Sequence, residues 1–227
     1  KQVREGHVTE PRFVAFVPAR GGSQRLPRKN LRDLGGKPLI HWTIDVARGA
    51  GLDSYVITDD REIAAAALDK TNVLMEPPIT DLGLDIRWVK MALANVQCDA
   101  FVILRPTSPF RTVSMIERAM ERFLDVLPDS LRAVSPVKQT PYKMWVCKED
   151  GRSPTMLMKP LLEAYRTIGE SDNVPTPLHD TPTQTHPHLY IQNASLEIAW
   201  RRTVEQTGTI SGKKIIPYFT EYPEDLD

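Results

Sequence analysis

Hydrophobic and polar positions form alternating blocks along the first 140 residues of the chain. Short apolar runs rich in β-branched and aromatic residues predict buried strands, and they lie at 13–17, 54–58, 72–75, 99–104 and 133–137. Between them, apolar residues recur at the spacing of about 3.6 residues that is typical of helices, over 38–50, 59–70, 84–94 and 114–127. In the last of these helices, Ser114 and Glu117 have the spacing of a capping box.

This alternation of strands and helices predicts βαβ units joined by right-handed crossovers. The fold class is therefore α/β, with a three-layer architecture around a mostly parallel sheet. Ligands of such sheets bind beyond the carboxyl ends of the strands. The unusual polar segments 18–30, 58–60 and 105–111 all follow predicted strands, so we expect them to share one site.

The pattern changes after residue 138. Residues 138–190 are rich in proline, threonine and histidine and have few helix signals, and the segment is too long for a simple loop. We interpret it as an inserted small lobe, partly β, that covers the site or mediates dimerisation. Strands are expected to return at 189–191, 196–200 and 213–217. The globular domain is predicted to span residues 12–227, after a flexible N-terminal segment, residues 1–11.

The segment 18–30 carries the clearest chemistry. Two glycines and a serine stand among four cations directly after a buried strand. Glycines allow backbone N–H groups to approach phosphates, and cations balance their charge. The spacing is neither that of a Walker A loop nor that of a dinucleotide fingerprint. A plain basic surface loop is the structural alternative.

Composition narrows the choice of ligand. Among 227 residues, 29 cations balance 29 anions, so bulk attraction to nucleic acid or to an anionic membrane is not indicated. A basic loop in a neutral protein indicates a small anionic ligand. Only two cysteines occur, Cys98 and Cys147, without metal-ligand spacing, so a reduced cytoplasmic compartment is expected. No apolar run has the length of a membrane span, so membrane insertion is not expected.

At this point the motifs support a resemblance. The segments Val17 to Asn30 (VPARGGSQRLPRKN) and Gly35 to Leu39 (GGKPL) resemble the nucleotide-binding signature of the acylneuraminate cytidylyltransferases, also called CMP-sialic acid synthetases. Further matching positions are Thr58-Asp59-Asp60, the segments 106–111 and 141–145, Gln184, Pro187, Tyr190 and Asn193. The ending, residues 224–227 (EDLD), resembles the metal motif of that family, and the chain stops inside it, which indicates an excerpt of a longer protein.

The resemblance implies a Rossmann-like nucleotidyltransferase fold and a reaction. CTP and an acidic nonulosonic sugar would give the CMP-sugar and pyrophosphate. The sugar hydroxyl is the nucleophile, so catalysis would consist of positioning and of charge neutralisation at the α-phosphate. The cofactor implied is Mg²⁺ bound by Asp225 and Asp227, since magnesium prefers a few carboxylates together with water and phosphate oxygens. An acidic terminal tail is the alternative for this pair. The family also implies a homodimer and a role in surface polysaccharide synthesis.

The resemblance assigns site residues by position. The catalytic residues implied are Arg20, Lys29, Asp225 and Asp227. The nucleotide-binding residues implied are Ala19, Arg20, Gly21, Gly22, Ser23, Gln24, Arg25, Lys29, Asn30, Asp59, Thr107 and Ser108. The sugar-binding residues implied are Arg105, Lys143, Gln184 and Asn193. Turn formation at 107–108, a solvated Lys143 and a capping Asn193 are the structural alternatives.

Four positions depart from the family pattern. Gln24 replaces a phosphate-binding lysine, Glu76 replaces an arginine, Arg105 replaces a glutamine and Thr183 replaces an arginine. Our hypothesis is that Arg105 supplies the cation lost at Thr183. The alternatives that stay open are a different sugar or nucleotide, and a catalytically impaired nucleotide-binding paralogue.

Overall fold

The structure is a computed structural model that describes residues 10–23, 26–77, 84–147, 158–162, 165–168 and 174–224. The chain divides into two compact units. Lys1–Ser135 together with Gln192–Asp227 form the first unit, and Pro136–Ile191 form the second. The second unit occupies the part of the chain where the sequence predicts an inserted lobe, and the predicted role of that lobe in dimerisation stays a prediction.

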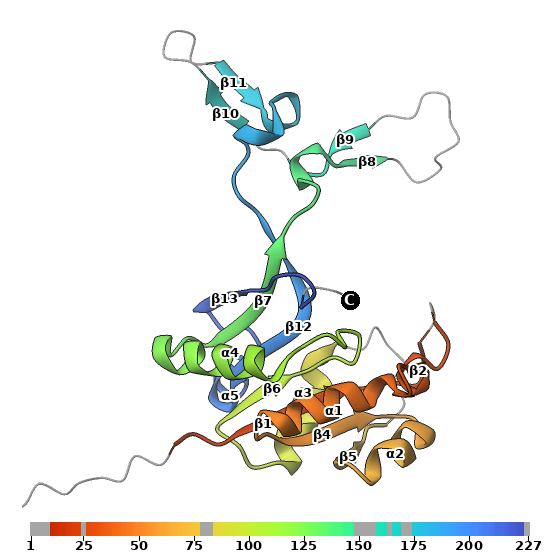
Figure 1. Ribbon diagram of the computed structural model, residues 1–227. Helices are drawn as coiled ribbons and strands as arrows, with labels where there is room; N and C mark the ends of the chain where they lie inside the picture. Colours follow the sequence, from red (N-terminus) through yellow and green to blue (C-terminus); the bar gives the residue numbers. More distant parts are fainter. Residues whose placement is uncertain are drawn as a thin grey trace, which may run out of the picture. The chain divides into compact units, whose positions relative to one another are not determined.

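The first unit is built on a seven-stranded sheet with the strand order β13-β7-β12-β6-β1-β4-β5 (Figure 1). Its strands are β1 (Phe13–Pro18), β4 (Asp53–Thr58), β5 (Asn72–Met75), β6 (Ala100–Ile103), β7 (Ser130–Pro136), β12 (Tyr190–Trp200) and β13 (Ile215–Phe219). β1 pairs in parallel with β4 and β6, β5 pairs in parallel with β4, and β13 pairs in parallel with β7. β12 runs antiparallel to β6. The prediction of a mostly parallel sheet is confirmed.

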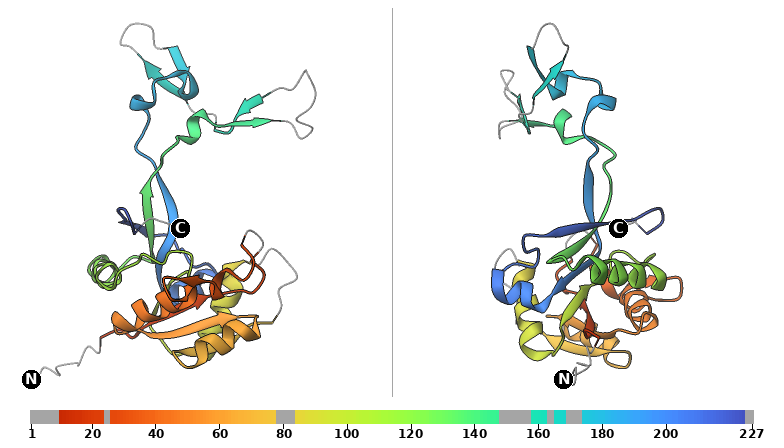
Figure 2. Two further views of the ribbon diagram at one scale, coloured as in Figure 1. Left: turned by 45° about the vertical axis from the view of Figure 1, so that its right-hand side comes forward. Right: turned by 90° about the vertical axis from the view of Figure 1, so that its left-hand side faces the viewer.

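Helices cover both faces of this sheet. They are α1 (Leu39–Gly49), α2 (Arg61–Leu68), α3 (Asp85–Asn95), α4 (Val113–Val126) and α5 (Arg201–Thr207). Buried side chains of α1, α2 and α4 join one apolar cluster, and those of α3 and α5 join the other. The right-hand view of Figure 2 shows α1 and α4 on one side of the strands and α3 and α5 on the other. The three-layer α/β architecture is therefore confirmed.

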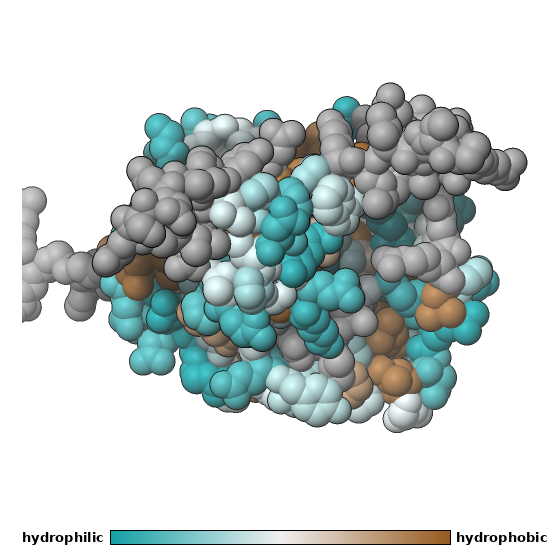
Figure 3. All heavy atoms as spheres, turned by 90° about the horizontal axis from the view of Figure 1, so that it is seen from above, coloured by the Kyte–Doolittle hydropathy of each residue, from teal (hydrophilic) through white to brown (hydrophobic). Residues whose placement is uncertain are grey.

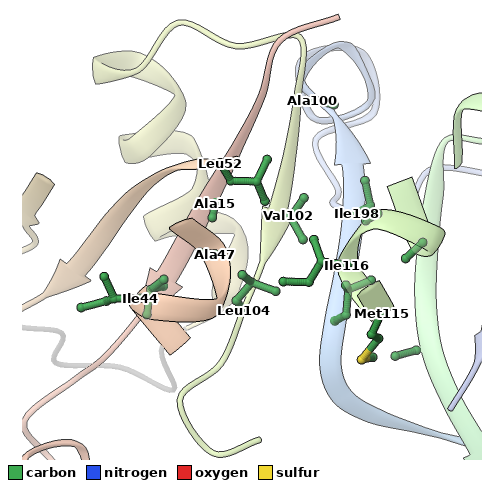
Figure 4. Close-up of a cluster of buried hydrophobic side chains, with 14 of the residues drawn as sticks. Ala15, Ile44, Ala47, Leu52, Ala100, Val102, Leu104, Met115, Ile116 and Ile198 are labelled. Atoms are coloured by element: carbon green, nitrogen blue, oxygen red, sulfur yellow. The ribbon is translucent and has the colours of Figure 1, made fainter. Parts of the chain in front are cut away.

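The side chains of β1 pack against the helices on both faces of the sheet. Ala15 and Val17 join the cluster of α1 and α4, whereas Val14 and Phe16 join the cluster of α3. All four are fully buried, because successive side chains of a strand point to opposite faces and both faces are covered. Figure 4 shows the first cluster, to which Ala15 contributes from β1, Ala47 from α1 and Ile116 from α4.

Polar side chains determine where two helices begin. The Asp60 carboxylate accepts hydrogen bonds from the backbone N–H groups of Glu62 and Ile63 and so caps α2. Thr112 caps α4 by accepting from the N–H of Met115. The predicted capping box of Ser114 and Glu117 is wrong, because the chain is already helical at Val113 and the Thr112 hydroxyl occupies the capping position.

Two predictions for the C-terminal part need correction. The expected strands 189–191 and 196–200 are one continuous strand, β12, which passes from the second unit into the first. Sequence reasoning also missed α5, a short helix whose buried Val204 belongs to the second apolar cluster. With only seven residues, α5 has too few positions for a clear helical period.

Smaller elements complete the two units. The first unit also contains the helical turn η1 (Lys29–Leu31) and the hairpin of β2 (Asp33–Leu34) and β3 (Lys37–Pro38). The second contains two antiparallel pairs, β8 (Trp145–Cys147) with β9 (Met158–Pro160) and β10 (Tyr165–Ile168) with β11 (Val174–Pro177). It also contains η2 (Pro141–Lys143), η3 (Leu178–Asp180) and η4 (Thr183–Thr185). Within it, the buried His186 ring bonds to Thr181 and to the carbonyl of Leu178.

The face of the molecule that Figure 3 presents is mostly polar. In Figure 3, hydrophilic side chains predominate on the face in view, and hydrophobic ones form small separate groups. Of the helices in the described residues, none has both the length and the apolar character that a bilayer crossing requires.

Candidate functional site

A cavity of about 230 Å³ lies at the carboxyl ends of β1 and β6. Because β1, β4, β5 and β6 run in parallel, the segments that follow them meet at this edge of the sheet. The cavity is lined by Pro18, Arg20, Gly22, Ser23, Lys29, Asn30, Asp85, Trp88, Arg105, Pro106 and Thr107. Three of these residues are cations, so the cavity is suited to an anionic ligand.

Arg20 is held from three directions. Its side-chain Nε donates to Glu76 Oε1 at 2.8 Å, and Glu76 is buried just beyond β5. Its carbonyl accepts from Asn30 Nδ2 at 3.1 Å. The next backbone N–H, that of Gly21, donates to Asp59 Oδ1 at 2.9 Å. These contacts come from the segment after β5, from η1 and from the segment after β4. The first holds the guanidinium, and the other two hold the backbone on either side of the peptide that follows Arg20.

Gly21 meets the first turn of α2 at close range. A Cβ atom at this position would lie 2.9 Å from Cβ of Asp60, the residue that caps α2. Such a separation is too short for two carbon atoms. A Cβ at Gly22 would meet nothing within 4 Å. Packing therefore requires glycine at position 21 but not at position 22.

The backbone of the loop is partly occupied by internal bonds. The Gly21 N–H is bonded to Asp59, and the Ser23 N–H donates to the carbonyl of Gly21. The loop offers fewer backbone donors for phosphate than its glycine content suggests. The side chains of Arg20 and Lys29 are therefore the stronger candidates for phosphate binding.

Arg105, which also lines the cavity, belongs to a network of ion pairs. Its Nη2 donates to Asp85 Oδ2 at 2.5 Å and to Glu197 Oε1 at 3.0 Å. Glu197 also pairs with Arg132, and Asp85 accepts a bond from Trp88 Nε1 at 3.0 Å. Burial alone raises the pKa of Asp85, but the hydrogen bond and charge of Arg105 outweigh it and hold that pKa below its ordinary value.

The loop after β6 is anchored by a second arginine. The buried Arg111 donates from Nε to the carbonyl of Ser195 at 2.5 Å and from Nη2 to the carbonyl of Arg105 at 2.9 Å. Burial lowers the pKa of Arg111 to about 9, so it stays charged at neutral pH. Among the described residues, neither Arg111 Nη1 nor the buried Ser108 hydroxyl has a hydrogen-bond partner.

The structure brings together most of the predicted nucleotide residues it describes. Arg20, Gly22, Ser23, Lys29, Asn30 and Thr107 line the cavity. Arg105, which the resemblance assigns to the sugar, lines the same cavity. The loop is also held by backbone contacts: the N–H of Ala19 donates to the carbonyl of Ile57, and the N–H of Gly21 donates to Asp59. Ser108 follows Thr107 and is buried. The predicted residues Gln24, Arg25, Asp225 and Asp227 lie outside the described residues.

The other predicted sugar residues are Lys143, Gln184 and Asn193. Lys143 and Gln184 belong to the second unit, so their predicted role stays a prediction. The Asn193 amide donates to Thr220 Oγ1 at 2.5 Å, and its oxygen accepts from the Ser195 hydroxyl. No group of three or more His, Cys, Asp or Glu side chains suited to a metal occurs among the residues described.

Four charged or aromatic residues of the site were missed by sequence reasoning: Asp85, Trp88, Arg132 and Glu197. Asp85 and Trp88 are one turn apart at the start of α3, the only local signal that they could share a face. Arg132 and Glu197 lie inside strands that otherwise read as apolar runs. A charge inside a buried strand is a signal that could have identified them, since such charges need partners.

The chain is similar to known cytidylyltransferases. The sequence profile of the cytidylyltransferase family matches residues 14–146. The chain is 35% identical over 115 residues to a 3-deoxy-manno-octulosonate cytidylyltransferase of Bdellovibrio bacteriovorus, covering 50% of this chain and 47% of that protein. It is 36% identical over 141 residues to a CMP-N,N'-diacetyllegionaminic acid synthase of Legionella pneumophila, covering 57% and 60%.

A third relative is an N-acylneuraminate cytidylyltransferase of Streptococcus agalactiae, 32% identical over 152 residues that cover 63% of this chain and 37% of that protein. In all three, the match spans less than two thirds of the relative's own length. Among solved structures, a CMP:2-keto-3-deoxy-manno-octonic acid synthetase complexed with CTP superposes with a TM-score of 0.65. It covers 92% of this chain and 90% of its own at 16% identity, which is a likeness of fold.

Proposed function

The chain belongs to the cytidylyltransferase family, and from that premise we propose that it activates an acidic sugar with CTP. The hydroxyl oxygen of the sugar attacks the α-phosphorus, and the bond from that phosphorus to the bridging oxygen of the β-phosphate breaks. The products are the CMP-sugar and pyrophosphate, and the hydroxyl proton leaves to solvent. The observation that carries the proposal is the cavity, which places Arg20, Lys29 and Arg105 around one space at the carboxyl ends of the strands.

The residues around the cavity have separable roles in this reaction. Arg20 and Lys29 bind the phosphates and balance the charge that develops on pyrophosphate. We assign the nucleoside to the Thr107 hydroxyl and the Asn30 side-chain oxygen, and the sugar to Arg105. Because the nucleophile belongs to the sugar, the protein contributes position and charge rather than a covalent intermediate.

We also propose that a divalent cation, Mg²⁺, is bound by Asp225 and Asp227. Two carboxylates suit a metal that completes its shell with water and phosphate oxygens, and the metal supplies further charge neutralisation at the phosphates. The carboxylates of Asp59 and Asp60 are already engaged with the Gly21 N–H and with the start of α2, so they do not replace that pair. Chelation with EDTA is expected to abolish turnover, and added Mg²⁺ is expected to restore it.

One experiment tests the proposal as a whole. Pyrophosphate release is measured with each of the four nucleoside triphosphates and with 3-deoxy-manno-octulosonic, N-acetylneuraminic and N,N'-diacetyllegionaminic acids. Release with CTP and one of these acids, and with no other triphosphate, supports the proposal. Equal release with ATP or GTP, or release without any sugar, contradicts it.

The Arg20–Glu76 ion pair favours a second candidate, a nucleotide-binding protein with weak turnover. A buried carboxylate on Arg20 reduces the positive charge available to the triphosphate. This candidate predicts CTP binding by calorimetry together with no pyrophosphate release for any acid in the panel. The same assay therefore separates the two candidates.

The second unit is proposed to form a homodimer contact. The support is the family resemblance and an antiparallel architecture in which, among the described residues, each short strand pair has edges without a further strand. Sedimentation of the intact chain tests this. A monomer at micromolar concentration would contradict it.

A further inference from the structure

The ion pair between Arg105 and Asp85 suggests how the charge of Arg105 is balanced before a ligand binds. We propose that Asp85 is an internal stand-in for the carboxylate of the acidic sugar: it pairs with Arg105 in the free protein and is displaced when the sugar carboxylate binds. The inference rests on the proposed function, because it takes the ligand to be an acidic sugar. It adds a specificity-determining exchange between two named residues.

The two carboxylates on Arg105 differ in how firmly they are held. The Glu197 side chain is 3% exposed and also pairs with Arg132, so its position beside Arg105 is fixed. The Asp85 side chain is 40% exposed and lines the cavity, and Arg105 itself is 24% exposed. An exposed ion pair is weak and exchanges readily, whereas a buried one does not. Only Asp85 is therefore placed to give way.

The geometry of the pair favours exchange. Both carboxylates are bonded to one nitrogen, Nη2, of Arg105. Within the described part of the chain, Nε and Nη1 of this arginine have no hydrogen-bond partner, and its side chain is partly exposed. A ligand carboxylate that accepted the Nη2 hydrogen bond in place of Asp85 could accept from a second nitrogen of the guanidinium at the same time. Bidentate pairs of this kind are stronger than the single contact that Asp85 makes.

Displaced Asp85 would keep other partners. Its second oxygen accepts from Trp88 Nε1, and the positive charge of Arg20 acts on the same carboxylate. The exchange therefore leaves no unpaired charge, which keeps its cost low. Because Trp88 both bonds Asp85 and lines the cavity, its fluorescence should report the exchange.

A rival interpretation makes the opposite prediction. If Asp85 only orients Arg105, its removal should weaken the binding of an acidic sugar. If Asp85 is a stand-in, its removal should strengthen that binding, because the ligand no longer competes. Asp85→Asn separates the two, since the amide oxygen still accepts from Trp88 while the charge is lost.

The decisive measurement is the KM of the acids in the pyrophosphate assay at saturating CTP and Mg²⁺. Removal of a partly exposed competing ion pair should lower the KM of the accepted acid by about threefold in Asp85→Asn. The 1-carboxamide of the same sugar should show no change. Arg105→Gln should raise the KM of the acid, and in that background Asp85→Asn should have no further effect. A higher KM for the acid in Asp85→Asn, or an equal change for acid and amide, would overturn the inference.

A second measurement does not depend on the sugar. Acetate, as a bare carboxylate, is titrated at constant ionic strength against chloride while tryptophan fluorescence is followed. We expect a saturable change in the wild-type protein that is lost in Arg105→Gln and in Trp88→Phe. If no acid of the panel supports turnover while this change is present, the proposed function fails and the exchange stands. The same response in Arg105→Gln as in the wild type would overturn the exchange.

Discussion

Arg20 and Arg105 reach the same cavity from the ends of neighbouring strands, β1 and β6, yet they are held in different ways. The carboxylate on Arg20 belongs to Glu76, whose side chain is 4% exposed, whereas the more loosely held carboxylate on Arg105 belongs to Asp85, which is 40% exposed. Burial fixes the first pair and leaves the second free to exchange. We propose on this ground that the cavity has a rigid phosphate side at Arg20 and an adjustable sugar side at Arg105.

The largest expected effect comes from removing each arginine in turn. Arg20→Ala should lower kcat/KM for CTP by about 100-fold or more, because a preorganised charge at the phosphates is lost. Arg105→Ala should instead raise the KM of the sugar and leave the KM of CTP unchanged. Pyrophosphate release under variation of each substrate measures both values.

Arg12→Ala is the matched control for these variants, because Arg12 pairs with Asp53 at the surface and does not line the cavity. It should retain wild-type kinetics. If Arg20→Ala and Arg105→Ala both raised only the KM of CTP, the division of the cavity into two sides would be wrong.

The next effect concerns the loop that carries Arg20. Gly21→Ala should lower the free energy of unfolding by about 1–3 kcal/mol, because the new methyl group overlaps Asp60 and disturbs the cap of α2. Gly22→Ala is the control, since a Cβ there meets nothing within 4 Å. Urea denaturation of both variants measures the difference, and equal stabilities would contradict the packing argument.

Glu76→Gln tests the fixed pair itself. Loss of a charge-assisted hydrogen bond should lower the free energy of unfolding by about 1–2 kcal/mol, and Arg20 should lose its fixed position, so kcat should fall. Glu62→Gln is the matched control, because the Arg28–Glu62 pair is largely exposed and such pairs contribute little. A wild-type kcat in Glu76→Gln would show that the pair does not position Arg20.

The smallest effect is a pH dependence on the adjustable side. The pKa of Asp85 is below its ordinary value in the folded protein, so its ionised form contributes stability above the unfolded value of about 3.9. That contribution should be lost as the pH falls from about 4 through the lower folded value. Stability measured from pH 6 to pH 3 should therefore fall less steeply in Asp85→Asn. An identical slope in both proteins would contradict the assignment.

Sequence reasoning predicted the parts of the molecule that depend on neighbours along the chain. The strand 13–17, the glycines of the loop and the position of Arg20, Lys29 and Thr107 near strand ends follow from periodicity and from the rule for ligands of parallel sheets. The cap of α4 was assigned to Ser114 instead of Thr112, because neighbouring hydroxyl residues are equivalent in a sequence pattern. The single strand β12 was divided in two, because its start lies in a segment without clear alternation.

The sequence could not predict which carboxylates pair with Arg20 and Arg105, and these partners set the charge of the cavity. Arg20 and Glu76 are 56 residues apart, and Arg105 and Glu197 are 92 residues apart. The sequence by itself determined that cations follow strands β1 and β6 and that the chain folds around a mostly parallel α/β sheet. Only the tertiary structure decided which carboxylate each cation meets and how deeply the pair is buried, because burial and dielectric are properties of the packed edge of the sheet.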